Sequence, residues 1–237
     1  MKIDMVLFDL DGTLLPMDND EFTRGYFKLL AKKVAACGYE ADTLVDSIWT
    51  GVAAMVKNDG ARSNEEAFWD KFESIYGPKV YDDKPVFDEF YAVDFKQARC
   101  FCGFNPKAAE AVALVRELGL RTALATNPLF PSVATETRIG WAGLNRQDFE
   151  LVTTYENSRF CKPNPEYYRE MASGLGVECY NCLMVGNDAG EDMLAAQQAG
   201  MSAFLLTDCL INRHNLDISA VPHGGFEELA AYLRTLR

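Results

Sequence analysis

The sequence predicts an α/β fold whose mostly parallel sheet is interrupted, after its first strand, by an all-helical insertion. From about residue 100 onward, short apolar segments alternate with amphipathic ones, which is the pattern of right-handed βαβ units. Between residues 16 and 101, amphipathic segments follow one another with no apolar strand between them. We therefore expect a doubly wound, Rossmann-like core made of residues 1–15 and 102–237, with residues 16–101 as a separate helical domain.

The first strand is predicted over residues 3–10, and amphipathic helices follow at residues 21–37, 41–57, 64–76 and 85–95. These helices carry several large aromatic residues: Trp49, Phe68, Trp69, Phe72 and Tyr76. We interpret the aromatic residues as the core of a small helical bundle. The alternative is that one or two of them line a substrate pocket.

The later strands are predicted at residues 120–126, 149–154, 182–186 and 202–206. Helices are expected at residues 108–118, after Pro131, from residue 165 to Gly174 or Gly176, and at residues 191–199 and 226–236. Two of these helices follow an Asn-Pro pair, at residues 105–106 and 164–165. Such a pair combines an N-cap side chain with a proline at the first helical position.

Composition and charge exclude several partners. The formal net charge is -12, so the chain lacks the basic surface that nucleic acid and anionic membranes require. No run of about 18 apolar residues predicts a transmembrane helix, and the first residues lead into a strand without the pattern of a signal peptide. A small phosphorylated metabolite stays possible as a ligand, because one local cation acts on it at short range.

The seven cysteines are an odd number without a secretory signal, which is typical of free thiols in the reducing cytoplasm. Cys179 and Cys182 have the C-x-x-C spacing, and Cys100 and Cys102 form a second close pair. A structural zinc or redox role is the less favoured interpretation, because the two histidines of the chain lie in neither pair.

Polar residues follow the ends of three predicted strands: Asp9 and Asp11, then Thr126 and Asn127, then Asn187 and Asp188. Ligands of doubly wound sheets bind beyond the carboxyl ends of the strands, so we expect these residues at one site. A carboxylate can attack phosphorus, and a second carboxylate two residues along can protonate a leaving oxygen and later deprotonate water. Two carboxylates this close repel each other, and Mg²⁺, which prefers carboxylate and carbonyl oxygen, relieves that repulsion.

Four motifs in order make the chain resemble the haloacid dehalogenase-like hydrolases, most of which are Mg²⁺-dependent phosphatases. The first is D-L-D-G-T at residues 9–13, and the second is the strand end L-A-T-N at 124–127. The third is F-C-K-P-N-P-E-Y-Y at 160–168, and the fourth is M-V-G-N-D-A-G-E-D-M at 184–193. The resemblance covers essentially the whole chain and implies the family's fold.

The resemblance implies a role for each motif residue. Asp9 would be the nucleophile that forms an aspartyl-phosphate, and Asp11 would be the general acid and base. Thr126, through its hydroxyl, and Asn127, through its backbone amide, would hold the phosphoryl group. Lys162 would neutralise both the nucleophile and the phosphoryl group.

The resemblance also implies Mg²⁺ as cofactor, held by the side chain of Asp9, the backbone carbonyl of Asp11 and the side chain of Asp188. The fourth motif has Gly-Asn-Asp where many members have Gly-Asp. Counted back from Asp192, both Asn187 and Asp188 have a spacing that occurs in the family. We favour Asp188, because a carboxylate binds Mg²⁺ more strongly than an amide. Asn187 and Asp192 are alternative or supporting ligands.

The predicted function is hydrolysis of a small phosphorylated metabolite. An intramolecular sugar-phosphate mutase would use the same Asp9, and a non-catalytic regulatory protein is the third possibility. A dehalogenase is disfavoured, because dehalogenases of this family lack the second carboxylate, Asp11.

The insertion resembles the family's helical cap, which would close over the site between hinges at residues 14–21 and 100–105. Residues 14–17 are Leu-Leu-Pro-Met, where the family's phosphoglycolate phosphatases and sugar-phosphate mutases often carry acidic or small polar residues. We therefore assign neither of these substrates. The oligomeric state stays open.

Overall fold

The computed structural model describes residues 2–236, and a parallel five-stranded sheet lies at the centre of this part of the chain. The strand order is β2-β1-β3-β4-β5, and every neighbouring pair is parallel. The strands are β1 (Met5–Phe8), β2 (Arg121–Leu124), β3 (Cys182–Gly186), β4 (Ser202–Leu206) and β5 (His223–Gly224). Because β1, β2 and β3 are neighbours and run in the same direction, the residues that follow them meet at one edge of the sheet.

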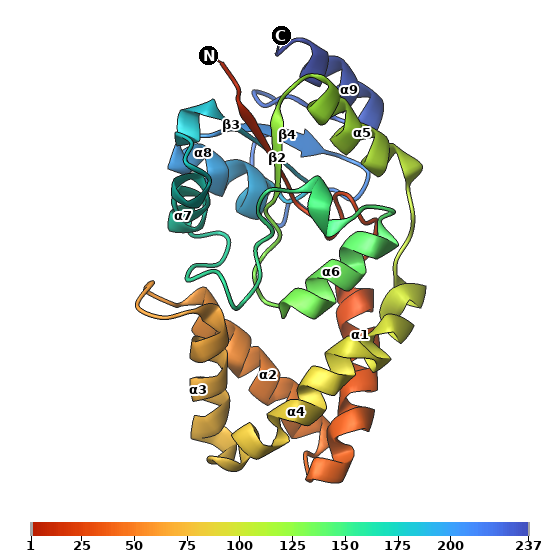
Figure 1. The fold of residues 1–237 in the computed structure, drawn as a ribbon, viewed down its shortest axis with the longest axis vertical. Helices are drawn as coiled ribbons and strands as arrows, with labels where there is room; N and C mark the ends of the chain where they lie inside the picture. The colour runs from red at the N-terminus through yellow and green to blue at the C-terminus, as the bar shows by residue number, and fades with distance from the viewer. Residues whose placement is uncertain (1, 237) are drawn as a thin grey trace.

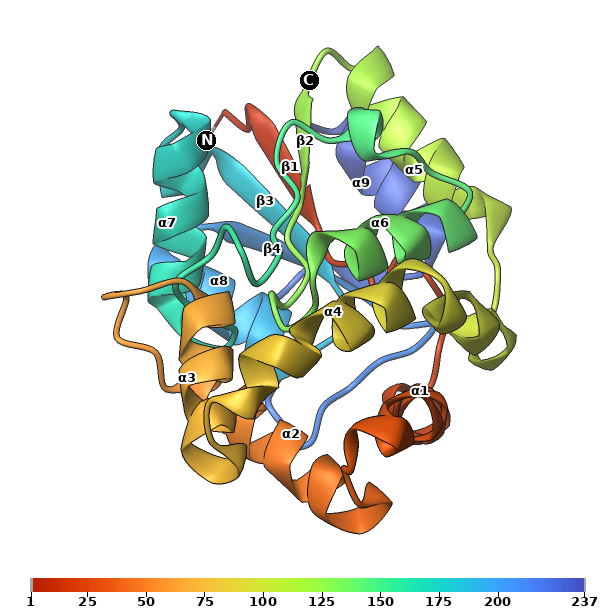
Figure 2. The ribbon, with the colours of Figure 1, turned by 60° about the horizontal axis from the view of Figure 1, so that its bottom comes forward.

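Helices cover both faces of the sheet (Figure 2). Val6 and Phe8 of β1 pack on one face with α5 (Pro106–Glu117) and α9 (Phe226–Arg234). Met5 and Leu7 point to the other face, where α7 (Pro165–Leu175) and α8 (Ala195–Ala199) cover them. A parallel sheet buried on both faces is the doubly wound arrangement, so the predicted fold class is confirmed.

The two Asn-Pro pairs start helices, as predicted. The side chain of Asn105 accepts a hydrogen bond from the backbone nitrogen of Lys107 at the start of α5, at 3.0 Å. The side chain of Asn164 accepts one from the backbone nitrogen of Glu166 at the start of α7, also at 3.0 Å. Each side chain thus satisfies one of the free N–H groups of the first helical turn.

The segment between β1 and α5 is helical and lies on the side of the sheet to which the strands' carboxyl ends point (Figure 1). Its helices are α1 (Asn19–Val34), α2 (Ala41–Val56), α3 (Asn64–Tyr76) and α4 (Lys79–Ala92). The insertion also contains short 3₁₀ segments at Ala35–Cys37 and Asp94–Phe101. Two further 3₁₀ segments, Arg146–Asp148 and Cys179–Asn181, lie in the rest of the chain. No helix in the described part of the chain has the length and apolar character needed to cross a membrane.

The aromatic residues of the insertion divide into two groups. Trp69 and Phe72 are buried in the apolar core shared by the helices, as predicted for a bundle. Trp49, in contrast, is 50% exposed although it is large and apolar. Phe68 and Tyr76 are partly buried and pack against the same core. The core interpretation therefore holds for these four residues and does not describe Trp49.

Two boundaries differ from the prediction because of local chemistry. Helix α4 begins at Lys79 rather than near residue 85, and Pro85 lies inside it. Pro85 is exposed, so its missing N–H and its ring face solvent. The helix expected from residue 191 begins earlier, as a π-helical turn over Ala189–Leu194 that continues into α8.

The edges of the sheet also differ from the prediction. Residues 149–154, predicted as a strand, form a single parallel bridge between Val152 and Leu124 of β2. The segment then turns, because the side chain of Asn157 accepts a hydrogen bond from the backbone nitrogen of Thr154 at 2.9 Å. The two-residue strand β5, which follows Pro222, is too short for an alternation pattern to predict.

Candidate active site

The predicted site residues gather around one pocket of about 270 Å³ at the carboxyl edge of the sheet. The pocket is lined by side chains from all three predicted strand ends: Asp9, Asp11, Thr126, Asn127, Asn187, Asp188 and Asp192. Helices α1 and α2 contribute Phe22, Thr23 and Trp49 from the opposite side. The insertion therefore forms part of the wall of the same pocket.

Lys162 binds two aspartates from different motifs. Its Nζ lies 2.8 Å from Oδ1 of Asp9 and 2.6 Å from Oδ1 of Asp192. All three residues are buried. Burial lowers the pKa of Lys162, but the attraction of Asp192 and Asp9 outweighs burial and leaves this pKa well above its ordinary value. Lys162 is therefore a fixed positive charge beside Asp9.

Burial and neighbouring charges shift the pKa of Asp9 in opposite directions. Burial raises its pKa most, Lys162 lowers it, and the neighbouring charges of Asp192 and Asp11 raise it, so that the pKa of Asp9 is about 7. Lys162 therefore does not fully offset the effects of burial and of the neighbouring carboxylates on Asp9. Additional positive charge at this site would favour the ionised form of Asp9.

Asp192 also organises the backbone of the fourth motif. Its Oδ2 accepts hydrogen bonds from the backbone nitrogens of Asn187, at 3.0 Å, and Asp188, at 2.9 Å. A Cβ at Gly186 would lie only 2.2 Å from this Oδ2. The glycine before Asn187 is therefore required for the carboxylate to approach the turn.

Asn187 is held by the first motif and by a later loop. Its Oδ1 lies 2.9 Å from the hydroxyl of Thr13, which also lies 3.0 Å from Oδ2 of Asp9. Its Nδ2 donates a hydrogen bond to the carbonyl oxygen of Cys209 at 2.7 Å. A Cβ at Gly12 would lie 2.4 Å from the same nitrogen, and Gly12 has a φ of 83°. The glycine of D-L-D-G-T thus serves both a left-handed turn and a close approach.

Asp188 is less buried than Asn187 and has a different set of partners. Its Oδ1 accepts hydrogen bonds from the backbone nitrogens of Gly190, at 2.7 Å, and Glu191, at 2.9 Å. These bonds cap the π-helical turn and direct the carboxylate to the pocket that it lines. Both of these hydrogen bonds are accepted by Oδ1, so Oδ2 of Asp188 is available for a ligand.

Asp11 forms an ion pair that the sequence did not reveal. Its Oδ2 pairs with Nη1 of Arg138, a fully buried residue of α6 (Ser132–Trp141). The Arg138 guanidinium also stacks over the ring of Phe130, at 4.2 Å from the centroid. An arginine in an amphipathic helix is expected at the surface, so only the folded structure shows that the charge of Arg138 is directed to Asp11.

Hydrogen bonds to the backbone of Thr126 hold the second motif in place, and the side chain of Asn127 contacts Glu191. The carbonyl oxygen of Thr126 accepts hydrogen bonds from the hydroxyls of Thr153, at 2.7 Å, and Tyr167, at 2.9 Å. Nδ2 of Asn127 donates to Oε2 of Glu191 at 3.0 Å. Burial raises the pKa of Glu191. Sequence reasoning missed Glu191, although it directly precedes Asp192 in the fourth motif.

The donor atoms of the site fit a hard divalent cation. Within residues 2–236, no three His, Cys, Asp or Glu side chains are placed as a ready metal centre. The expected Mg²⁺ set, however, contains only two carboxylate side chains and one backbone carbonyl, and Mg²⁺ usually retains several waters. Oδ1 of Asp11 and Oδ1 of Asn127 are buried acceptors without a hydrogen-bond partner among the described residues. The free Oδ1 of Asn127 and the excess of carboxylates over cations suit a cation in this pocket.

Comparison with known proteins agrees with the four motifs. The model of the haloacid dehalogenase-like hydrolases matches residues 3–200. A phosphoglycolate phosphatase of Neisseria gonorrhoeae is 26% identical over 84% of this chain and 77% of its own length. A glyceraldehyde 3-phosphate phosphatase of Methanopyrus kandleri is 25% identical over 84% of this chain and 82% of its own length.

Solved structures show the same fold over the whole chain. A 2-haloacid dehalogenase from Pseudomonas syringae pv. Tomato DC3000 superimposes with a TM-score of 0.65 at 19% sequence identity, covering 99% of this chain and 100% of that chain. At this identity the likeness concerns the fold and not the reaction.

The chain belongs to the haloacid dehalogenase-like hydrolases. The relatives named above, together with the second carboxylate Asp11, identify it as an enzyme of the phosphatase type, a hydrolase of phosphate esters.

Proposed function

We propose that this enzyme is a Mg²⁺-dependent phosphatase of a small phosphorylated metabolite, and that Asp9 is its nucleophile. The observation that carries the proposal is the pairing of Asp9 with the buried Lys162, at 2.8 Å, at a strand end where Asp11 follows two residues later. Catalysis of phosphoryl transfer depends mainly on positioning and on charge stabilisation. Asp9 and Asp11 at the strand end would supply the positioning, and Lys162 would supply positive charge.

Catalysis would proceed in two displacements. Asp9 attacks phosphorus, the bond between phosphorus and the ester oxygen breaks, and Asp11 gives its proton to the departing alcohol. Asp11 then takes a proton from water, which attacks the phosphorus of the aspartyl-phosphate. The bond to Asp9 breaks, inorganic phosphate leaves, and both carboxyl groups return to their starting states. Oδ1 of Asp11 is the candidate proton carrier, because Oδ2 is engaged by Arg138.

The other polar residues would hold the phosphoryl group and the metal. We assign phosphoryl contacts to Thr126, Asn127 and Lys162. Mg²⁺ would be held by the side chains of Asp9 and Asp188 and the backbone carbonyl of Asp11, and when bound it would neutralise charge on the phosphoryl oxygens. The side chains of Asn187 and Asp192 are already hydrogen-bonded to protein groups, which favours supporting positions for them.

We further propose that residues 16–101 act as a cap over a core made of residues 1–15 and 102–237. Support comes from Phe22, Thr23 and Trp49, which lie in the wall of the catalytic pocket opposite the aspartates. The named relatives act on phosphoglycolate and glyceraldehyde 3-phosphate, which supports a small phosphorylated substrate here. The seven free thiols support a reducing compartment such as the cytoplasm.

The test is phosphate release from a panel of phosphorylated metabolites, measured with Mg²⁺ for the wild-type enzyme and for Asp9→Asn. We expect release by the wild type and none above background by the variant. Isomerised sugar phosphate without release would show a mutase. Undiminished release by Asp9→Asn would contradict the proposed nucleophile.

A further inference from the structure

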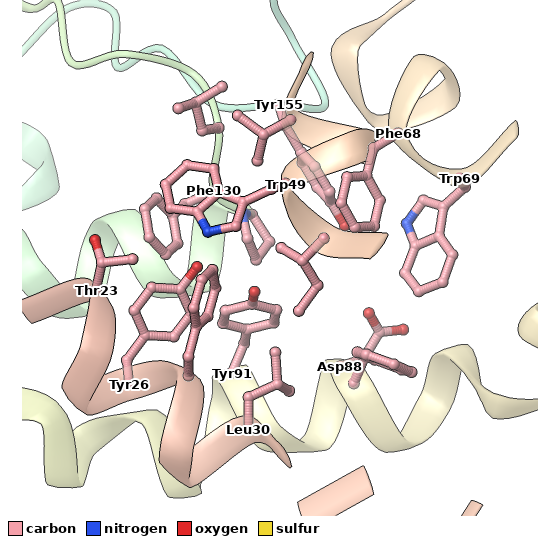
Figure 3. Close-up of a pocket in the computed structure, with 16 residues that line it drawn as sticks. Thr23, Tyr26, Leu30, Trp49, Phe68, Trp69, Asp88, Tyr91, Phe130 and Tyr155 are labelled. Carbon is pink, nitrogen blue, oxygen red and sulfur yellow. The ribbon is translucent and has the colours of Figure 1, made fainter. Parts of the chain in front are cut away.

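A second cavity lies between the helical insertion and loops of the core (Figure 3). It measures about 100 Å³, and its wall contains aromatic rings from α1, α2, α3 and α4 together with the loop after β2. The rings that matter here are Tyr26, Phe27, Trp49, Phe68, Tyr91 and Phe130. Figure 3 shows the rings of Tyr26, Trp49, Phe68, Tyr91 and Phe130 arranged around a common space.

The wall of this cavity is close to neutral. Asp88 is the one acidic or basic side chain among the described lining residues, and Nζ of Lys84 pairs with it at 3.1 Å. Burial raises the pKa of Tyr26 and of Tyr91, so both phenols keep their protons at neutral pH. No lysine, arginine or histidine of the described chain lines the cavity to receive an anionic group. An uncharged, apolar occupant therefore fits best.

The cavity and the catalytic pocket share a wall. Thr23, Trp49, Leu129 and Phe130 line both of them. The half-exposed Trp49 packs edge-on against Phe27, with ring centroids 5.6 Å apart. A group that extends from the phosphoryl position toward the insertion would therefore reach Trp49, which is also part of the wall of the aromatic cavity.

We propose that this cavity receives the leaving group of the substrate, and that the preferred substrates are phosphate monoesters of apolar, ring-bearing alcohols. The proposal rests on the proposed phosphatase function. An apolar cavity of about 150 Å³ accommodates benzene in other proteins, so a cavity of about 100 Å³ that shares four lining residues with the catalytic pocket suits one small ring.

The binding test uses two phosphonates, which the enzyme cannot hydrolyse. Calorimetry with the full chain and Mg²⁺ compares benzylphosphonate with methylphosphonate. We expect the benzyl compound to bind at least about tenfold more tightly, since one methylene-sized group in an apolar pocket already changes discrimination by about tenfold or more. Equal affinities, or tighter binding of methylphosphonate, would overturn the proposal.

Two matched variants test whether the preference for benzylphosphonate arises in the aromatic cavity. Val52 of α2 lines the cavity, and Val56, one turn later in the same helix, is exposed. Val52→Trp should abolish the preference for the benzyl compound and leave methylphosphonate binding unchanged, whereas Val56→Trp should keep the preference. If Val52→Trp does not fold, Val52→Leu should reduce the preference. A preference that survives in the folded Val52 variant would contradict the assignment.

Measurements of kcat/KM distinguish a failure of the proposed substrate class from a failure of the proposed phosphatase activity. The ratio of kcat/KM for benzyl phosphate to that for 2-phosphoglycolate should exceed about ten, following the binding difference. Absence of phosphate release from every ester, with the benzylphosphonate preference intact, would refute the phosphatase proposal while supporting the apolar cavity as a binding site. Faster turnover of 2-phosphoglycolate would overturn the substrate class proposed here.

Discussion

At the scale of single residues, Asp9 and Asp11 can lie close together because each forms an ion pair with a different buried cation. Lys162 reaches Asp9 from the third motif, and Arg138 reaches Asp11 from α6. Breaking such a buried pair would leave an uncompensated charge, which is far more costly than the pair is stabilising. The first motif therefore depends on residues more than 100 positions away in the chain.

The metal assignment gives a prediction at this scale. Asp188→Asn keeps an oxygen that can cap the π-helical turn but removes the negative charge, so the Mg²⁺ concentration for half-maximal activity should rise at least about tenfold. Asn187→Ala should change it less, because the side chain of Asn187 is already bonded to Thr13 and Cys209. Titrating Mg²⁺ against phosphate release measures both variants. Normal Mg²⁺ dependence in Asp188→Asn would contradict the assignment.

Arg138 gives a second prediction, as a positioning residue for Asp11. Arg138→Gln should lower kcat for an alkyl phosphate by about tenfold or more, because the general acid is no longer held in place. The loss should be smaller for 4-nitrophenyl phosphate, whose leaving group needs no proton, and Arg138→Lys should recover part of it. Arg116→Gln, which removes an exposed pair with Asp148, is the control. Equal losses for both substrates would indicate a structural role only.

At the scale of elements, the start of α3 is tied to the loop that carries Lys162. The backbone nitrogens of Asn64 and Glu65 donate to the carbonyl oxygens of Ser158 and Tyr155, at 2.9 and 2.8 Å. The side chain of Asn64, which is fully buried, donates to the carbonyl oxygen of Phe160 at 3.3 Å. The insertion is thus attached to the core at a point far from both chain crossings.

Removing this attachment should cost stability. Asn64→Ala removes a buried side chain and leaves the partly buried carbonyl group of Phe160 without its donor, so the free energy of unfolding should fall by about 1–3 kcal/mol. Ser74→Ala, at an exposed position of the same helix, is the control and should change it by less than about 0.5 kcal/mol. Urea unfolding measures both. An unchanged midpoint for Asn64→Ala would show that these hydrogen bonds do not hold the insertion.

Elements with strong local chemistry were predictable from sequence, and those decided by distant contacts were not. Helix α3 has the predicted bounds because Ser63 and Glu66 form a capping box at its start. The segment at residues 149–154 has strand-like residues, but it lies at the sheet edge and turns after one bridge. The aspartates of the site follow from motifs. Arg138 was missed because nothing local in sequence distinguishes it from a surface charge, and Glu191 was missed although it lies within the fourth motif, because its contact with Asn127 depends on the fold.

At the scale of the whole molecule, one cysteine lies where the insertion meets the core. Cys161, next to Lys162, is buried with Met55 and Tyr155, and its Sγ lies 3.3 Å from Nδ2 of Asn64. Burial raises the pKa of the Cys161 thiol to about 12. Its reactivity therefore reports whether the insertion is packed on the core.

Thiol labelling tests this packing. Burial raises the pKa of the Cys161 thiol and keeps it protonated at pH 8, so iodoacetamide should modify Cys161 far more slowly than the exposed Cys100. Asn64→Ala should speed the labelling of Cys161 but not of Cys182, which is buried in β3 and serves as the internal control. Mass spectrometry of the labelled peptides measures each rate. Equal rates at Cys161 and Cys100 would contradict the packed arrangement.

The central claim is that Asp9 carries the phosphoryl group during turnover. The most direct measurement is mass spectrometry of the peptide containing Asp9 after rapid acid quenching of the enzyme with 4-nitrophenyl phosphate and Mg²⁺. We predict phosphorylated Asp9 in the wild type and a larger amount in Asp11→Asn, because the base that activates water is lost. Phosphate release with no phosphorylated Asp9 in either protein, or a phosphoryl group on another residue, would contradict the account.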